Sequence, residues 1–347
     1  VQNVAIDSDL GSEANSNNFG VFVSDQGSPT ENVTLSGVTA AGFETGVLIS
    51  DFYGRVIQNV ELSTVDATGS TDTGLVVAET DQGAGISGLT GQNEFESIQT
   101  NQVVQTAVNL ASTGATIEVG EGTYNENVVV ASGLPNSGDV SGLTITNVDA
   151  TSPEIVFEPS SSTGIPDNVT ALGATDAGNL ATVEIYEPDV TFEGIDVTRN
   201  AAGDRSANSG FNTQGIAVRD SGATVQDVAI DSNLGSEADS NNFGVFVSDE
   251  GSPTENVALD TVVADGFEVG VLISDFYGSS ITGGDLTSID ATSSTDVGLN
   301  IAETSQGAGI SGISGQDEFE SIRTNQVLQT AVDLASAGAD IEVREST

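Results

Sequence analysis

The sequence predicts an all-β protein built as a parallel β-helix solenoid. Gly-apolar-x-apolar tetrads begin at Gly215, Gly244, Gly270 and Gly298, at spacings of 29, 26 and 28 residues. Further alternating runs such as "ATVQDVAI" lie between them, with loops rich in Gly, Ser, Asn and Asp. Short strands at a near-constant period, without helical spacing between them, are typical of one solenoid coil per period. A β-sandwich or a propeller is the alternative, but propeller blades usually carry periodic aromatics, and only 5% of these residues are aromatic.

A long internal repeat predicts the domain organisation. Residues 1–123 align without gaps on residues 225–347, with roughly 72% of positions identical, which gives a period of 224 residues. We therefore expect residues 1–97 to be the C-terminal part of one β-helix domain plus a linker. Residues 98–321 would be a complete domain plus a linker, and residues 322–347 the cap helix and first strand of the next. The expected whole is a longer polypeptide of tandem domains.

The start of the complete domain predicts a short capping helix near residues 100–112. Thr100 or Ser97 is the expected N-cap, and Gly114 stands where a helix C-terminal glycine belongs. The apolar residues of one helical face are Val104, Ala107, Val108 and Ala111. Strand alternation then begins at "TIEV". A helix at this position would cover the open end of a stacked sheet.

This segment resembles the N-terminal cap and first coil of right-handed parallel β-helix, pectin-lyase-like proteins. The resemblance covers about 35 residues, a length typical of one supersecondary unit. The residues that carry it are Ile98, Gln99, Ala107, Val108, Ala111, Gly114, Ile117, Val119, Gly122, Thr123, Tyr124, Glu126, Asn127 and Val128. In the second copy Ser346 replaces the glycine of "GTY". The resemblance implies a right-handed solenoid, but it does not imply one activity, because this fold hosts many.

Composition indicates a salt-adapted protein. The chain has 52 acidic residues, six Arg, no Lys and no His, for a formal net charge of −46. Such self-repulsion destabilises a compact chain in dilute buffer, but at molar salt the screening length falls to about 3 Å. This composition resembles that of proteins from halophilic archaea; an acidic solubilising face on an ordinary protein is the alternative. No basic patch is present for nucleic acid, and no segment is apolar enough to predict a membrane span.

An enzyme is the less favoured interpretation. Pectate-lyase-like chemistry needs an Arg or Lys base, but Lys is absent and no Arg is shared by the two copies. The unshared positions are Arg55 opposite Ser279, Arg323 opposite Gln99 and Arg344 opposite Gly120; Arg199, Arg205 and Arg219 lie in the segment present once. "DFYG" at Asp51 and Asp275 resembles the nucleophile segment of pectin methylesterases, but the companion Gln-Asp and Gly-Arg-Pro-Trp segments are missing. We therefore expect a coil-corner turn there and no catalytic residue.

The sequence contains candidates for two kinds of site, a calcium site and a glycosylation site. Acidic loops offer hard-cation ligands, although their spacing departs from that of an EF-hand loop and a solvated loop is the favoured alternative. These calcium candidates are Asp7, Asp9, Glu13, Asp231, Glu237 and Asp239. No other cofactor is expected, and the chain has no Cys to hold a metal or a disulfide. Asn-x-Thr acceptors for glycosylation stand at Asn32 and Asn168.

Near-identical domains in a row add length and multivalency rather than a new active centre. The expected function is therefore that of a non-enzymatic extracellular structural protein, a tandem β-helix fibre, surface filament or adhesin at the cell surface. Its partners would be neighbouring copies of the domain or chain and possible cell-surface glycans. A viral fibre or spike that binds host glycans, and a secreted polysaccharide lyase or esterase, are the alternatives.

Overall fold

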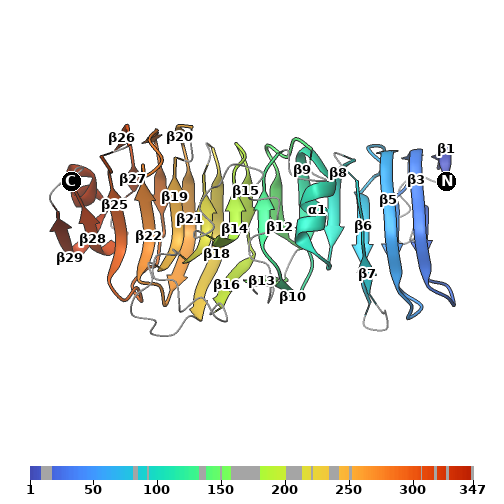
Figure 1. Cartoon of the computed structure of the whole chain (residues 1–347), viewed down its shortest axis with the longest axis horizontal. Coiled ribbons are helices and arrows are strands. Elements are labelled where there is room, and N and C mark those ends of the chain that lie inside the picture. The colour runs from blue at the N-terminus through green and yellow to red at the C-terminus, as the bar shows by residue number, and fades with distance from the viewer. Residues whose placement is uncertain are drawn as a thin grey trace. The chain divides into compact units, whose positions relative to one another are not determined.

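The protein is described by a computed structural model (Figure 1), in which the chain divides into two compact units. Unit 1 comprises Val1–Tyr124 with Ala131–Thr151, and unit 2 comprises Asn125–Val130 with Ser152–Thr347. The structure describes residues 1–8, 18–80, 85–91, 94–132, 138–148, 151–157, 180–200, 213–219, 222–233, 242–249, 252–305, 307–315, 319–325 and 328–344.

Unit 1 alternates between two stacks of parallel strands. A four-stranded sheet has the order β1-β3-β5-β7, and a second run pairs β2, β4, β6, β8, β9 and β12 in that order. The chain visits the two stacks in turn, and we call each pair of successive strands, one in each stack, a coil. The elements are β1 (Gln2–Asp7), β2 (Phe19–Ser24), β3 (Thr30–Ala41), β4 (Thr45–Ser50), β5 (Ile57–Asp66), β6 (Thr73–Ala78), β7 (Ile86–Ser87), β8 (Phe95–Thr100), α1 (Val104–Leu110), β9 (Ala111–Val119) and β12 (Thr144–Asn147). β10 (Thr123–Asn125) spans the division between the units.

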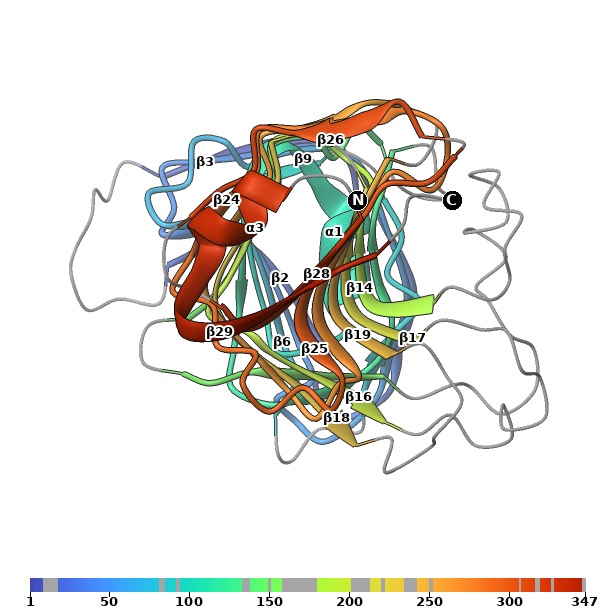
Figure 2. The same cartoon turned by 90° about the vertical axis from the view of Figure 1, so that its left-hand side faces the viewer.

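Unit 2 contains an eight-stranded parallel sheet in the order β11-β14-β17-β19-β22-β25-β28-β29. Its strands lie one behind another when viewed along the stack (Figure 2). A second run pairs β13, β16, β18, β21, β24 and β27, and a three-stranded sheet has the order β20-β23-β26.

The strands of the eight-stranded sheet are β11 (Val128–Val130), β14 (Leu180–Ile185), β17 (Thr213–Val218), β19 (Asn242–Ser248), β22 (Val269–Ser274), β25 (Val297–Ala302), β28 (Phe319–Thr324) and β29 (Ala335–Val343). The other elements of unit 2 are β13 (Glu154–Phe157), β15 (Thr191–Glu193), β16 (Asp196–Asn200), β18 (Thr224–Asn233), β20 (Thr254–Glu255), β21 (Ala258–Asp265), β23 (Ser280–Thr282), β24 (Asp285–Thr287), β26 (Gly309–Ser311), β27 (Ser314–Gly315) and α3 (Leu328–Leu334).

The predicted tetrads form the core of this sheet. Ile216, Val245, Val271 and Leu299 are paired in register along four neighbouring strands, and all four side chains are fully buried. The predicted spacings of 29, 26 and 28 residues are therefore confirmed as ladder spacings. All pairings among the described strands of each unit are parallel, which confirms an all-β protein with parallel sheets.

The tetrad glycines are required because neighbouring coils approach closely. A Cβ atom on Gly244 would lie 2.6 Å from the carbonyl oxygen of Gly270 and 2.7 Å from the Cβ of Ala264. Gly20, the counterpart in the first copy, would place a Cβ 2.7 Å from both the Ala40 Cβ and the Gly46 oxygen. Any larger residue would force the coils apart or disrupt the ladder.

The predicted helix is present, but its predicted ends are wrong. α1 has Val103 as its N-cap residue with no capping side chain, whereas the Thr100 hydroxyl accepts a hydrogen bond from the Gln102 N–H at 3.0 Å. The helix ends at Ala111, which already has extended dihedral angles and begins β9. Gly114 lies inside β9 at φ +72°, where its N–H donates to the Ser141 oxygen. Within the described residues neither helix meets the length and apolarity that a membrane crossing requires.

Candidate functional site: the junctions between repeats

The strand ladder of unit 1 runs through the predicted domain limit at residues 97/98. Ile98 of β8 pairs with Leu75 of β6 on one side and with Ile117 of β9 on the other. Ile145 of β12 extends the same row beyond Ile117, and all four side chains are buried. Because β8 belongs to both ladders, this limit falls inside a strand that joins one repeat to the next.

The second copy has the same arrangement at residues 321/322 of unit 2. Ile322 of β28 pairs with Leu299 of β25 and with Ile341 of β29. In both copies the pairing register shifts near the start of the strand, between Phe95 and Ser97 in β8 and between Phe319 and Ser321 in β28. The two junctions are therefore structural copies of each other, although the division of the chain into tandem domains stays a prediction.

The helix at each junction takes the place of one strand. In chain order α1 follows β8 where the earlier coils have β3, β5 or β7, and the four-stranded sheet ends at β7. The Leu110 side chain lies so close to Gly91 that a Cβ on this glycine would be 2.7 Å from it, and Leu334 has the same relation to Gly315. The expected covering role is thus confined to one sheet, while the other sheet continues past the helix.

A cavity of about 140 Å³ lies between α1 and the last strand of that sheet. Val103, Ala107 and Leu110 line it from the helix side, and Ile86 and Leu89 line it from β7 and the turn that follows. Its walls are mainly apolar. The helix therefore packs over the end of the sheet without filling all of the space beneath it.

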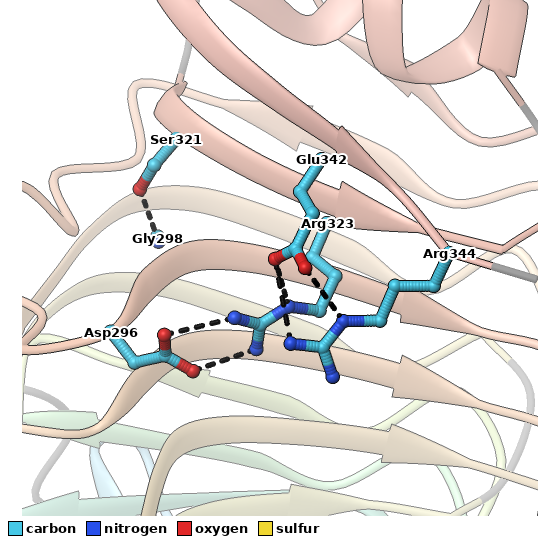
Figure 3. Close-up of polar contacts among 6 residues, drawn as sticks. All are labelled: Asp296, Gly298, Ser321, Arg323, Glu342 and Arg344. Atoms are coloured by element: carbon cyan, nitrogen blue, oxygen red, sulfur yellow. Dashed lines mark hydrogen bonds and ion pairs between the residues drawn. The ribbon is translucent and has the colours of Figure 1, made fainter.

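Polar side chains at the start of each junction hydrogen-bond to the preceding coil. The Ser97 hydroxyl accepts a hydrogen bond from the Gly74 N–H at 2.8 Å, and Ser321 does the same for Gly298 (Figure 3). The Asn101 side chain accepts from the Glu79 N–H and donates to the Glu79 oxygen, at 2.9 and 2.8 Å. Asn325 repeats this pair of hydrogen bonds with Glu303. Ser97 and Asn101 recur as Ser321 and Asn325 at the repeat spacing of 224 residues, and this recurrence is a usable sequence signal.

The second junction also carries an ion-pair network, drawn in Figure 3. The Arg323 guanidinium donates to both carboxylate oxygens of Asp296 at 2.7 and 2.9 Å, and to Glu342 at 2.8 Å. Arg344 donates to the other oxygen of Glu342 at 2.9 Å. Hydrogen bonding with Asp296 is the main cause that raises the pKa of Arg323, and the same contact lowers the pKa of Asp296.

The first junction has no such network at the equivalent positions. Gln99 stands where Arg323 is found, and Gly120 stands where Arg344 is found. The acidic partners are kept as Asp72 and Glu118. Arg323 thus connects three successive coils of unit 2 electrostatically, and the chain itself supplies a matched junction without the arginine.

The "DFYG" segments form turns, as expected. The Gly54 N–H donates to the Asp51 oxygen at 3.1 Å, and the Asp51 carboxylate is fully buried. Its two oxygens accept the N–H groups of Thr80 and Gly85 in the next coil, at 2.8 and 2.9 Å. Asp275 makes the same two contacts with Thr304 and Gly309. This carboxylate therefore shapes the next corner of the chain.

The calcium candidates are only partly within the described residues. Asp7 lies on β1 and Asp231 on β18, whereas Asp9, Glu13, Glu237 and Asp239 lie outside them. Asp231 is flanked by Asp265, Asp196 and Glu154; burial first, and then these charges, raise its pKa. Among the described residues no His, Cys, Asp and Glu cluster has a geometry that could hold a metal ion.

The glycosylation candidates, too, are only partly within the described residues. Asn32 is exposed on β3 at φ +57°, and its side-chain oxygen accepts a hydrogen bond from the Asn59 amide at 3.3 Å. Asn168 lies outside the described residues. Modification at either position stays a prediction.

Sequence reasoning missed a buried polar cluster in the segment present once. Arg219 donates to Gln214 and Ser248 at 3.4 and 3.5 Å, and its guanidinium lies 5.5 Å from the ring centroid of Tyr186. The Tyr186 hydroxyl donates to Glu184 at 2.7 Å. Arg199 is also buried, with its guanidinium 3.4 Å from the Phe157 ring centroid, and Arg205 lies outside the described residues. Except for Ser248, the counterpart of Ser24, these residues have no repeat partner, so the internal alignment gives no signal for them.

Comparisons of the chain with protein-family models, with curated proteins and with solved structures found no match.

Proposed function

We propose that this chain is part of a non-enzymatic extracellular structural protein, a tandem right-handed β-helix that forms a fibre, surface filament or adhesin at the cell surface. The observation that carries the proposal is the unbroken row Leu75, Ile98, Ile117 and Ile145 across the first junction. A flexible linker would let consecutive domains reorient freely. A shared strand instead makes each repeat the stacking surface of the next.

Such an arrangement extends without limit as repeats are added. Parallel strands stack about 4.8 Å apart, so each further coil lengthens the solenoid by that amount. In stacked repeat proteins, stability is approximately the sum of repeat and neighbour-interface contributions. Tandem units joined by β8-like strands would therefore behave as one long body whose length is set by the number of repeats.

The composition supports a role in a salt-rich environment. A net charge of −46 keeps copies of the chain apart in dilute buffer and is screened at molar salt. We therefore propose a halophilic organism, of archaeal type, as the source. Neighbouring copies of the domain are the proposed principal partners.

The geometry of the former enzyme candidates supports a structural role. Asp51 and Asp275 are buried and use both carboxylate oxygens to accept backbone N–H groups. The Arg323 guanidinium forms ion pairs with two carboxylates, an arrangement that suits a structural contact better than a catalytic base. These side chains have defined structural partners, and we propose no cofactor or metal for the protein.

Electron cryo-microscopy of the full-length protein, purified and imaged at molar salt, tests this proposal. We expect unbranched filaments in which a cross-strand repeat of about 4.8 Å continues through the junctions. Isolated compact domains connected by variable gaps would contradict it. A three-chain spike would favour the viral-fibre alternative, and cleavage or de-esterification of polysaccharide that Asp275→Ala abolishes would favour the enzyme.

A further inference from the structure

Each repeat displays a pair of aromatic side chains on its "DFYG" turn. Phe52 is 60% exposed and Tyr53 48% exposed, with ring centroids 5.3 Å apart in an edge-to-face arrangement. In unit 2 Phe276 is 52% exposed and meets Tyr277 edge-to-face at 5.2 Å. The two copies therefore present the same pair in the same geometry.

The turns that carry these pairs are held from the preceding coil. The buried carboxylate of Asp25 accepts the N–H of Tyr53 at 2.8 Å and also that of Arg55. Asp249 does the same for Tyr277 at 2.9 Å and for Ser279. A partner that binds the rings therefore does not have to order the backbone, which lowers the entropic cost of binding.

The exposed area limits what such a partner can be. An aromatic side chain offers about 150–250 Å² in total, so the exposed parts of the Phe52–Tyr53 pair amount to about 200 Å². The second pair exposes less, because Tyr277 is only partly exposed. A stable protein–protein interface needs about 800 Å² from each partner. One pair is thus far too small for a stable protein dimer, but it matches the apolar face of a single sugar ring.

The charge of the chain restricts the partner further. With 52 acidic residues and only six arginines, the protein has few cationic groups to pair with an acidic polymer at any salt concentration, and in dilute buffer it also repels one. A neutral sugar carries no such penalty. Arg55 beside the first pair is replaced by Ser279 beside the second, so the feature common to both sites is aromatic and does not include a cation.

We propose that the Phe52–Tyr53 and Phe276–Tyr277 pairs are binding sites for uncharged pyranose units of a polysaccharide. Each site alone is weak, with a dissociation constant on the order of 1 mM. A repeating polymer can engage several sites on a tandem array, and such linkage raises avidity by a factor of about 10²–10⁴. The proposal concerns recognition by the folded chain and does not depend on whether the chain forms filaments.

Affinity chromatography at molar NaCl on immobilised dextran, mannan and a β-glucan tests the proposal, with immobilised polygalacturonate as the acidic comparison. The variants are Phe52→Ser, Phe276→Ser and the double change. Phe22→Ser is the matched control, because Phe22 is 46% exposed but lies on β2 away from a "DFYG" turn. Circular dichroism checks that each variant keeps its strand content, and sedimentation measures its association state.

We expect retention on at least one uncharged polysaccharide and less on polygalacturonate. The double variant should bind at least about tenfold more weakly, each single variant should fall between, and Phe22→Ser should bind like the parent chain. Absence of retention on all three uncharged polymers would overturn the proposal, as would unchanged retention by the double variant. Dissociation of a self-associated chain by the double variant would assign the pairs to contacts between copies instead. Since binding is measured on the chain in solution, failure to see filaments would leave this result intact.

Discussion

Replacing Arg323 with Gln gives the second junction the residue that the first junction has at this position, Gln99. The change removes the bidentate contact with Asp296 and the contact with Glu342, which together link three coils of unit 2. The side chain of Arg323 is largely shielded, at 12% exposure, whereas that of Asp296 is 41% exposed. We expect a measurable but moderate loss of stability in unit 2.

The expected magnitude follows from this exposure. Exposed ion pairs contribute about 0.2–1 kcal/mol, and the bidentate geometry of the Arg323–Asp296 pair places it near the upper end. For a unit of this size a loss of about 1 kcal/mol lowers the melting temperature by about 2–4 °C. The reciprocal change Gln99→Arg should stabilise the first junction, because Asp72 and Glu118 are already present.

Salt and pH dependence distinguish an electrostatic loss from simple loss of packing. The difference between Arg323→Gln and the parent chain should shrink as salt rises toward 1 M, because the screening length falls to about 3 Å. Asp296 has a folded pKa below its ordinary value of 3.8. Its contribution is therefore complete above pH 3.8 and disappears as the pH falls through the lower folded value. Thermal melts across both series measure this, and an equal loss at all salt concentrations, or no loss at low salt, would refute the reasoning.

Three further changes have distinct expected outcomes. Lowering salt from molar to about 0.1 M should reduce the melting temperature of the whole chain, and an unchanged value would count against salt adaptation. Asp249→Ala leaves the N–H groups of Tyr277 and Ser279 without their carboxylate acceptor, so urea unfolding should show a loss of stability of about 1–3 kcal/mol for each N–H group. Asp249→Asn should lose less, and an Asp249→Ala variant as stable as the parent chain would contradict the assigned role. Asp231 has a raised folded pKa, so stability is lost as the pH rises from the ordinary value of 3.8 through the folded value. Asp231→Asn should therefore stabilise unit 2 at pH 7 but not at pH 3. Asp7→Asn is the control and should show no such gain, because Asp7 pairs with Ala41 whereas Asp231 pairs with Asp265.

The parts of the fold that the sequence predicts correctly are those with a short-range pattern. The Gly-apolar-x-apolar tetrads predict both the strands and their spacing, because each tetrad must place its apolar residues over those of the preceding coil. The helical face of Val104, Ala107 and Val108 is also predicted correctly from its spacing, and all three side chains are buried. The glycine at Gly244 also follows from the pattern, because neighbouring coils leave no space for a Cβ.

The parts that sequence reasoning misses depend on contacts between distant residues. Thr100 and Gly114 have the residue types of helix caps. Thr100 instead pairs with β6, the Gly114 N–H donates to the Ser141 oxygen, and the helix begins and ends between them. The sequence places Asp231 at the start of an acidic loop, whereas the charges that affect it come from Asp196 and Asp265 on neighbouring strands. Its actual neighbours follow only from the strand register, which a single sequence does not encode locally.

The central claim is that consecutive repeats share a strand at their junction. Hydrogen exchange of the intact chain at molar salt, read by mass spectrometry on peptides that cover β4, β6, β8 and β9, tests this claim directly. Backbone amides in stable ladders open rarely, whereas those in flexible connectors exchange freely. We expect Phe95–Thr100 and Ala111–Val119 to exchange as slowly as Thr45–Ser50 and Thr73–Ala78. Fast exchange across Phe95–Thr100, between two protected neighbours, would show a flexible linker and contradict a shared strand at the junction.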